Sequence, residues 1–210
     1  MSRMSRIIDL THLIQNGLPP FPGDSETVLE QSRFYAADAF NNHQLTINMH
    51  AGTHIDGPMH LLDIHTYLHE IPIERFIGDA CLLDVSGQDE IDYKEQYESQ
   101  IQEGQIVVLH TGWGKSFGQP DYFTEYPVLK VAFGELLVRK KVPMVCMDMP
   151  SPDKAPHAVH KLLFSHEILI AENLNNVDQL LGVDSFEIIA LPLRIQADSS
   201  IARIVARVRG

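Results

Sequence analysis

Short apolar runs separated by polar, turn-forming residues recur along most of the chain. Runs or alternations of this length are typical of strands, whereas apolar residues spaced by a helical turn are typical of helices. These patterns predict strands over 7–10, 45–50, 80–85, 105–110, 142–147, 167–171, 186–191 and 201–208. They predict helices over 128–140 and 157–164, and the charged stretch 91–101 is compatible with a third helix.

The order of these elements predicts the α/β class. Strands and helices alternate, but their spacing is too irregular for a repeated βαβ unit, so we expect mixed strand directions. The sequence contains no linker-like segment and no repeat of fixed period, and it is long enough to bury one sizeable core. We therefore predict a single domain over residues 1–210.

Composition narrows the classes of partner. The 28 acidic residues outnumber the 16 Lys and Arg residues, which gives a formal charge of -12. This balance disfavours nucleic acid, because binding its phosphates requires a basic surface. The sequence contains neither an apolar run long enough to span a membrane nor the apolar region of a signal peptide. We expect a cytoplasmic protein that acts on a small-molecule substrate and binds neither nucleic acid nor membrane.

The two cysteines, Cys81 and Cys146, each lie inside an apolar run. Buried cysteines of this kind behave as small apolar side chains, and disulfide frameworks are typical of small secreted domains. We therefore expect two structural thiols and no disulfide.

The most informative segment is 50–60, which contains three of the 11 histidines together with Asp56. A helix is disfavoured here because Gly52, Gly57 and Pro58 interrupt it. The backbone is expected to turn instead, since the two glycines permit positive φ and close approach. Side chains from one short loop are then able to converge on one point.

This convergence predicts a metal site. On an extended stretch, His54 and Asp56 share a face, and His50 at the end of the preceding strand reaches the same centre. Two neutral imidazoles and one carboxylate leave open positions and suit Zn(II), Mn(II) or Fe(II). His60 either completes this sphere or begins a second one, with Asp56 bridging ions roughly 3.5–4 Å apart. Packing alone does not explain the cluster, because each buried imidazole would need its own hydrogen-bond partner.

A second cluster follows about a hundred residues later. His157 and His160 lie in the predicted helix, and Glu172 ends a predicted strand. At the end of a strand, Glu172 is a candidate metal ligand, and His160 is a candidate for moving protons. Each residue also fits an ordinary structural role, as a solvated glutamate or as one face of a short helix.

Segment 50–60 resembles the HxGTHxDxPxH signature of the cyclase family of metal-dependent hydrolases, which includes bacterial kynurenine formamidase and isatin hydrolase. The resemblance extends over nearly the whole chain. Besides the signature, it rests on Asp9–His12, Pro22–Asp24, Leu109–Trp113, Glu172–Leu174 followed by Asp178, and Ala190–Leu193.

The resemblance implies a role for each site residue. In this family the first two histidines and the aspartate of the signature hold one divalent ion. In two-zinc formamidases the aspartate bridges to a second ion, which is held by the last histidine of the signature and a late glutamate. The implied metal ligands are therefore His50, His54, Asp56, His60 and Glu172. The family's proton-transferring histidine matches His160.

The resemblance also implies the architecture. Family members are similar to a swivelling β/β/α domain, a small barrel of mixed strands flanked by helices, and they assemble as homodimers or homotetramers. Three segments differ from the family pattern: 147–153 carries two prolines, 194–201 lacks the usual glycines, and 61–63 lacks the usual aromatic residue. These differences fall on the expected pocket wall, so they bear on the substrate rather than on the metal.

The sequence thus predicts a metal-dependent amidohydrolase that resembles arylformamidase, which converts N-formylkynurenine to kynurenine and formate in tryptophan catabolism. We expect one or two divalent ions, zinc first and manganese as the alternative. A cyclic amide, as for isatin hydrolase, is the alternative substrate. Two other classes remain: a non-heme Fe(II) oxygenase, whose triad also contains a His-x-Asp pair, and a non-catalytic metal-stabilised module.

Overall fold

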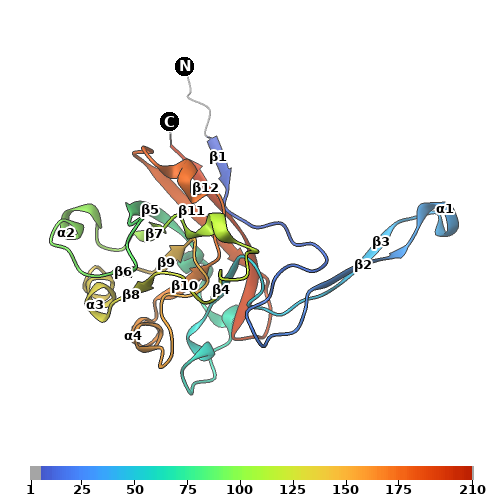
Figure 1. Ribbon diagram of the computed structural model, residues 1–210, viewed down its shortest axis with the longest axis horizontal. Helices are drawn as coiled ribbons and strands as arrows, with labels where there is room; N and C mark the ends of the chain where they lie inside the picture. Colours follow the sequence, from blue (N-terminus) through green and yellow to red (C-terminus); the bar gives the residue numbers. More distant parts are fainter. Residues whose placement is uncertain (1–5, 210) are drawn as a thin grey trace.

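The computed structural model describes residues 6–209 and is built around one eight-stranded mixed sheet (Figure 1). Its strands are β1 (Arg6–Asp9), β4 (His54–Asp56), β5 (Ile77–Asp84), β7 (Ile106–His110), β9 (Met144–Met147), β10 (Leu169–Glu172), β11 (Phe186–Pro192) and β12 (Ser199–Val208). Their order is β1-β12-β11-β5-β7-β9-β10-β4, and β4 also pairs with β12. This last pairing closes the sheet into a barrel, with β1 attached outside the ring. The α/β class and the mixed barrel are therefore confirmed.

The remaining elements are short. They comprise β2 (Val28–Arg33), β3 (Asn42–Thr46), β6 (Glu90–Ile91), β8 (Val128–Leu129), α1 (Tyr35–Asp38), α2 (Tyr97–Gln100), α3 (Val131–Arg139) and α4 (Ala158–Ser165). Five 3-10 turns complete the list: η1 (Pro58–His60), η2 (Leu68–Glu70), η3 (Ile73–Phe76), η4 (Trp113–Ser116) and η5 (Val177–Leu180). Within residues 6–209, every helix is too short or too polar to cross a membrane.

Strands β5, β7, β9 and β10 run parallel, and the last three are fully buried. Alternate residues face two different cores: Val108 and Cys146 belong to the cluster inside the barrel, and Val107 and Val145 to the cluster under α3 and α4. Parallel strands covered on both faces carry continuous apolar runs rather than alternation. This double burial is the reason these strands were easy to predict.

Two predicted elements are wrong. The alternation over 45–50 reflects a hairpin of β2 and β3 whose residues face solvent on both sides, and the strand ends at Thr46. His50 is instead placed by a turn, in which its N–H donates to Asn48 Oδ1 at 2.8 Å. The stretch 91–101 is divided between β6, which pairs with β8, and the single turn of α2.

The barrel closes where the three-residue strand β4 lies between β10 and β12. Ile55 points into the barrel core, which places its neighbours His54 and Asp56 on the outer face. The segment before β12 closely approaches the end of β4, where Gly57 donates its N–H to the Asp198 carbonyl at 3.0 Å. A Cβ on Gly57 would lie 2.8 Å from that carbonyl oxygen, so only glycine fits without a shift.

We expect Gly57→Ala to destabilise the protein by about 1–3 kcal/mol, because the added methyl group forces the backbone at Asp198 away from β4. Gly78→Ala is the matched control: its Cβ would make only an ordinary contact with Ile106 at 3.5 Å. Chemical denaturation of both variants measures the difference. Equal stabilities for the two variants would show that the close approach at Gly57 is unimportant.

Candidate metal centre

The centre of the site is a cross-strand pair at the seam of the barrel. Antiparallel pairing of β4 with β10 places Glu172 directly opposite His54. The two side chains lie on the same face, with His54 Nε2 3.3 Å from Glu172 Oε2. Both residues are buried. A histidine and a glutamate separated by more than a hundred residues thus become neighbours through strand register alone.

Two further ligand candidates join this pair from the signature segment. Asp56, two residues along β4, places Oδ1 3.3 Å from His54 Nε2. His50, on its turn, places Nδ1 2.9 Å from the same oxygen. The ligand atoms of one group, formed by His50, His54 and Asp56, thus lie within 4.8 Å of one another. This spacing allows all three to bind one metal ion. The extended stretch expected for His54 and Asp56 is confirmed.

A second group shares Asp56. Its other members are His160 on α4 and Glu172, and all three residues are buried. His160 Nε2 lies 3.4 Å from Glu172 Oε1. This arrangement differs from the one that the resemblance implies, because His160, rather than His60, is grouped with Asp56 and Glu172. The sequence pattern did not distinguish the two histidines, since both precede Glu172 at unknown distance in space.

His60 instead lies beside Asp198. Its Nδ1 is 3.2 Å from Asp198 Oδ2, and His50 Nε2 is 3.1 Å from the same oxygen. Asp198 was missed by the sequence analysis because it stands alone, in a loop without histidines. The pairing of β4 with β12 brings it to the site, since Ser199 lies opposite Asp56.

Hydrogen bonds around the histidines fix which nitrogen faces the centre. His54 Nδ1 lies 2.8 Å from the Gly52 carbonyl, and Gly52 adopts the expected positive φ of 64°. His160 Nδ1 lies 2.6 Å from Asp153, a carboxylate that also accepts the N–H of Val159 at the start of α4. Each Nδ1 therefore carries the proton, and each Nε2 keeps a lone pair for a metal ion. Gly57, by contrast, has a φ of -97°, and it is needed for the close approach to the Asp198 carbonyl.

The donor atoms at the centre fit a metal ion. Among the described residues, His54 Nε2, Asp56 Oδ1 and Glu172 Oε1 are buried without a hydrogen-bond partner. They lie 2.9–3.4 Å from neighbouring ligand atoms but are not aligned for hydrogen bonding. Unpaired buried polar atoms are costly, and atoms that converge on a shared point without bonding one another are typical of a coordination sphere. Imidazole and carboxylate are ligands of Zn²⁺ and related ions.

The electrostatics agree with this conclusion. Burial lowers the pKa of His50, but the carboxylates of Asp198 and Asp56 outweigh burial and raise that pKa to about 9. In the same way Asp153 and Glu172 overcome burial and raise the pKa of His160 to about 9. The carboxylates thus create a field that favours positive charge, which either protons or a divalent cation can supply.

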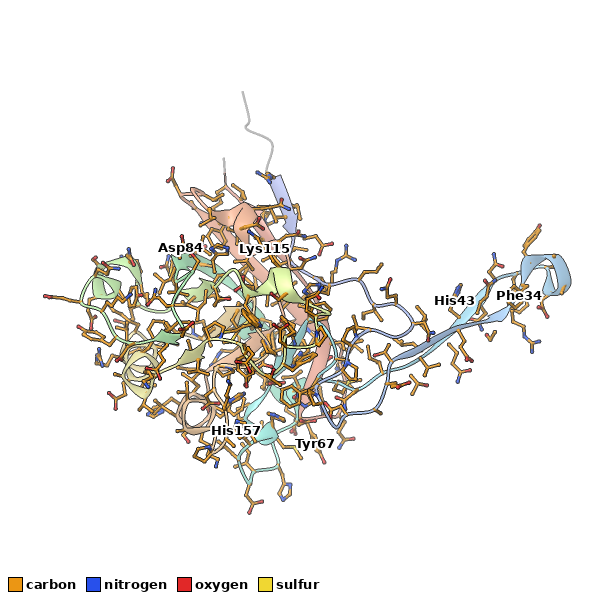
Figure 2. All side chains as sticks on the ribbon, in the orientation of Figure 1. Phe34, His43, Tyr67, Asp84, Lys115 and His157 are labelled. Carbon is orange, nitrogen blue, oxygen red and sulfur yellow. The ribbon has the colours of Figure 1, made fainter. Side chains whose placement is uncertain are left out.

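The ligand candidates line a cavity of about 270 Å³. Its polar wall contains all six predicted site residues, namely His50, His54, Asp56, His60, His160 and Glu172. Its other wall is apolar or aromatic and includes Phe21, Leu61, Phe123 and Pro150. His157, labelled in Figure 2, lies at the same cavity on the turn before α4. The structure therefore brings the predicted residues together, and their individual roles stay predictions.

Comparison with known proteins agrees with this geometry. A family model described as "Putative cyclase" matches residues 8–154. The kynurenine formamidase of Bacillus cereus is 31% identical over 211 residues, covering 98% of this chain and 99% of the relative. The chain belongs to the cyclase family.

Solved structures share this cyclase-family fold along nearly the whole chain. Isatin hydrolase A from Labrenzia aggregata, bound to benzyl benzoate, is 25% identical and has a TM-score of 0.85, with 98% of this chain and 94% of the other covered. A structure described as a potential metal-dependent hydrolase with cyclase activity has a TM-score of 0.83 at 24% identity and covers 99% and 100% of the two chains. The fold is therefore shared along the full length.

The histidine pKa values predict how the metal-free cyclase-family protein responds to pH. A pKa of about 9 for His50 and His160, against an ordinary 6.5, means that the folded state binds protons more tightly than the unfolded state. This stabilisation is complete below pH 6.5 and is lost as the pH rises to about 9. In chelator, the melting temperature should fall over that window. Zinc binds the neutral form of the two histidines. The difference in melting temperature between the zinc-loaded and the metal-free protein should therefore widen as the pH rises. A metal-free melting temperature that rises across the window would contradict the assignment.

Asp198→Asn tests whether the residue missed by sequence orients the cluster. Since Asp198 contacts both His50 and His60, we expect a loss of about 10–100-fold in metal affinity or hydrolytic rate. The control is Asp89→Asn, which removes an exposed carboxylate beside β6, away from the cavity. Metal titration and steady-state kinetics compare the two variants. Equal metal affinities and equal rates for the two variants would mean that Asp198 does not orient the histidines.

Proposed function

We propose that this protein is a metal-dependent amide hydrolase that acts as an arylformamidase on N-formylkynurenine. The observation that carries the proposal is the pair of ligand groups that share Asp56 in a cavity with an apolar wall. The likeness to a kynurenine formamidase along nearly the whole chain supports it. Hydrolysis of a cyclic amide such as isatin is the second candidate, supported by the likeness to isatin hydrolase A.

We further propose that the site holds two zinc ions. One would be held by His50, His54 and Asp56, and the other by Asp56, His160 and Glu172. A bound divalent ion lowers the pKa of water from 15.7 toward roughly 7 and polarises a carbonyl. Zinc fits the mixture of imidazole and carboxylate ligands, and manganese is the alternative.

His60 is then the residue that moves protons. Its ring lies outside the group formed by Asp56, His160 and Glu172, yet it lines the same cavity. Asp198 beside Nδ1 holds the proton on that nitrogen, which leaves Nε2 free to exchange a proton. His60 would take the proton of the attacking water and give it to the leaving nitrogen. This assignment exchanges the roles that the resemblance gives to His60 and His160.

The apolar wall supports an aryl substrate. Phe21 and Phe123 meet edge to face with ring centroids 5.5 Å apart, and Leu61 and Pro150 complete the wall. An aromatic ring of the substrate gains both buried area and edge-to-face contacts against such a surface. The wall therefore binds the ring, and the carboxylates and histidines face the bond that is cleaved.

The rival classes fit the site less well. The two ligand groups together contain two carboxylates, Asp56 and Glu172, and are built on a mixed barrel with helices, whereas a facial-triad oxygenase uses one carboxylate. Structural zinc sites are closed and rich in cysteine, and here Cys81 and Cys146 are both free. Free thiols are typical of a reducing compartment, which supports a cytoplasmic location.

The test combines elemental analysis with hydrolysis of N-formylkynurenine and isatin. We expect His54→Ala to lose both metal and activity. We expect His60→Ala to keep its metal and to lose about 10²–10⁴-fold in kcat, the usual contribution of a general acid or base. His65→Ala, which removes an exposed histidine beyond η1, is the control.

Three outcomes would contradict parts of the proposal. If His54→Ala keeps both its metal and its hydrolytic rate, the metal-dependent mechanism is wrong. If His60→Ala loses metal while His160→Ala keeps it, the two histidines have the roles that the resemblance implies. If isatin is cleaved and N-formylkynurenine is not, the second candidate is correct.

A further inference from the structure

A buried tyrosine lies behind the aromatic wall of the cavity. Tyr122 is fully buried, and its ring packs edge to face against the rings of Phe117 and Phe123, with centroids 5.1 and 4.9 Å away. Trp113 donates its Nε1–H to the Tyr122 carbonyl at 2.9 Å. Tyr122 is thus held by three aromatic neighbours, and one of them, Phe123, lines the cavity.

The hydroxyl group of Tyr122 faces the strands that carry the metal ligands. It donates to Asn173 Oδ1 at 2.8 Å, and Asn173 directly follows Glu172 at the end of β10. Burial, together with the negative charges of Asp148 and Glu172, raises the pKa of Tyr122 far above its usual range. The hydroxyl therefore keeps its proton and remains a hydrogen-bond donor.

This hydrogen bond fixes the orientation of the Asn173 amide. Because Oδ1 accepts from Tyr122, Nδ2 is turned toward Gly52 and donates to its carbonyl at 3.1 Å. The same carbonyl accepts the Nδ1–H of His54 at 2.8 Å. Asn173 and His54 thus share one acceptor, and the amide holds that carbonyl where it orients the His54 ring.

The backbone of Asn173 is fixed as well. Its N–H donates to the Met149 carbonyl at 3.0 Å, and its carbonyl accepts the hydroxyl of Thr53 at 2.6 Å. Its φ of 55° lies in the left-handed region, which asparagine adopts more readily than most residues. Because Thr53 directly precedes His54, Asn173 connects β4 and β10 immediately beside their ligands.

We propose that Tyr122 is a positioning residue for the metal centre, acting through Asn173 on the ring of His54. The inference rests on the proposed metal-dependent function, because it concerns the ions that His54 and Glu172 would hold. Without the hydroxyl, Asn173 Oδ1 would be buried and unpaired, and the amide would be free to turn away from Gly52. His54 Nε2 would then be aimed less accurately at the ion.

The ring and the hydroxyl of Tyr122 contribute to different parts of the site. The ring supports Phe123, which meets Phe21 in the apolar wall, whereas the hydroxyl supports the metal ligands. A substitution that removes only the hydroxyl should therefore weaken metal binding and leave the wall intact. A substitution in the wall should have the converse effect.

The first experiment measures zinc affinity by competition with a chelator of known affinity. Tyr122→Phe should lower the zinc affinity by about 10-fold, the lower end of the usual effect of a residue that supports a metal ligand. Tyr97→Phe is the matched control and should bind zinc like wild type. In the part of the chain that the structure describes, the Tyr97 hydroxyl is buried without a hydrogen-bond partner. Circular dichroism and the melting temperature of the metal-free protein verify that each variant is folded.

The second experiment tests whether Tyr122 acts through Asn173. Asn173→Gly removes the amide but tolerates the left-handed backbone, and it should lower the zinc affinity by about 10–100-fold. In this background Tyr122→Phe should have no further effect, because the hydroxyl has already lost its partner. If Tyr122→Phe weakens zinc binding equally in the wild-type and the Asn173→Gly backgrounds, the route through Asn173 is wrong.

The third experiment measures steady-state kinetics on N-formylkynurenine with zinc in excess. Tyr122→Phe should lower kcat and leave KM unchanged, because the ring that supports the wall remains. Phe123→Leu should raise KM roughly 3–10-fold through the loss of an aromatic contact, with the zinc affinity unchanged. A Tyr122→Phe variant with a raised KM and wild-type zinc affinity would show that the hydroxyl supports the wall instead of the ligands.

The outcomes separate this inference from the proposed function. If the wild-type protein binds zinc but hydrolyses neither N-formylkynurenine nor isatin, the proposed substrates are wrong, and the zinc affinities still decide the role of Tyr122. If the wild-type protein and Tyr122→Phe bind zinc equally tightly, the inference alone is wrong. A wild-type protein that binds neither zinc nor manganese would overturn both.

Discussion

The structure depends on the pairing of one three-residue strand with two neighbours. Strand β4 lies between β10 and β12, and its register sets Glu172 opposite His54 and Ser199 opposite Asp56. Because side chains alternate along a strand, Ile55 completes the barrel core while His54 and Asp56 face outward. Closing the barrel and assembling the metal ligands are thus one event. A shift of register by one residue would turn His54 and Asp56 into the barrel core and Ile55 toward the cavity that the ligands line.

The same seam concentrates negative charge. Asp56, Glu172 and Asp198 approach the seam from three strands or strand ends, and imidazoles fill the space between them. This arrangement holds the pKa of Asp56 well below its usual range, against the effect of burial, because His54 and His50 lie beside it. Buried carboxylates at this density require a compensating cation. The barrel supplies the rigid frame, and the unpaired ligand atoms define where that cation belongs.

Much of the fold was predictable from the sequence, for a physical reason. Buried parallel strands such as β7 and β9 carry continuous apolar runs that identify them without further information. The strand predicted over 45–50 was wrong because the alternating residues of the hairpin pack against no apolar core of this chain. His50 therefore follows a turn instead of a strand. The signature segment showed which residues are chemically active. It did not show that His160 joins Asp56 and Glu172, or that Asp198 joins the site, because both facts depend on strand register and helix placement.

The most direct test of the central claim is an anomalous-difference map at the zinc edge, from crystals of the protein loaded with zinc. We expect two peaks roughly 3.5–4 Å apart. One should lie against His50, His54 and Asp56, and the other against Asp56, His160 and Glu172. Zinc peaks at the protein surface alone, with no peak beside the side chains at the seam of the barrel, would contradict the two-ion site.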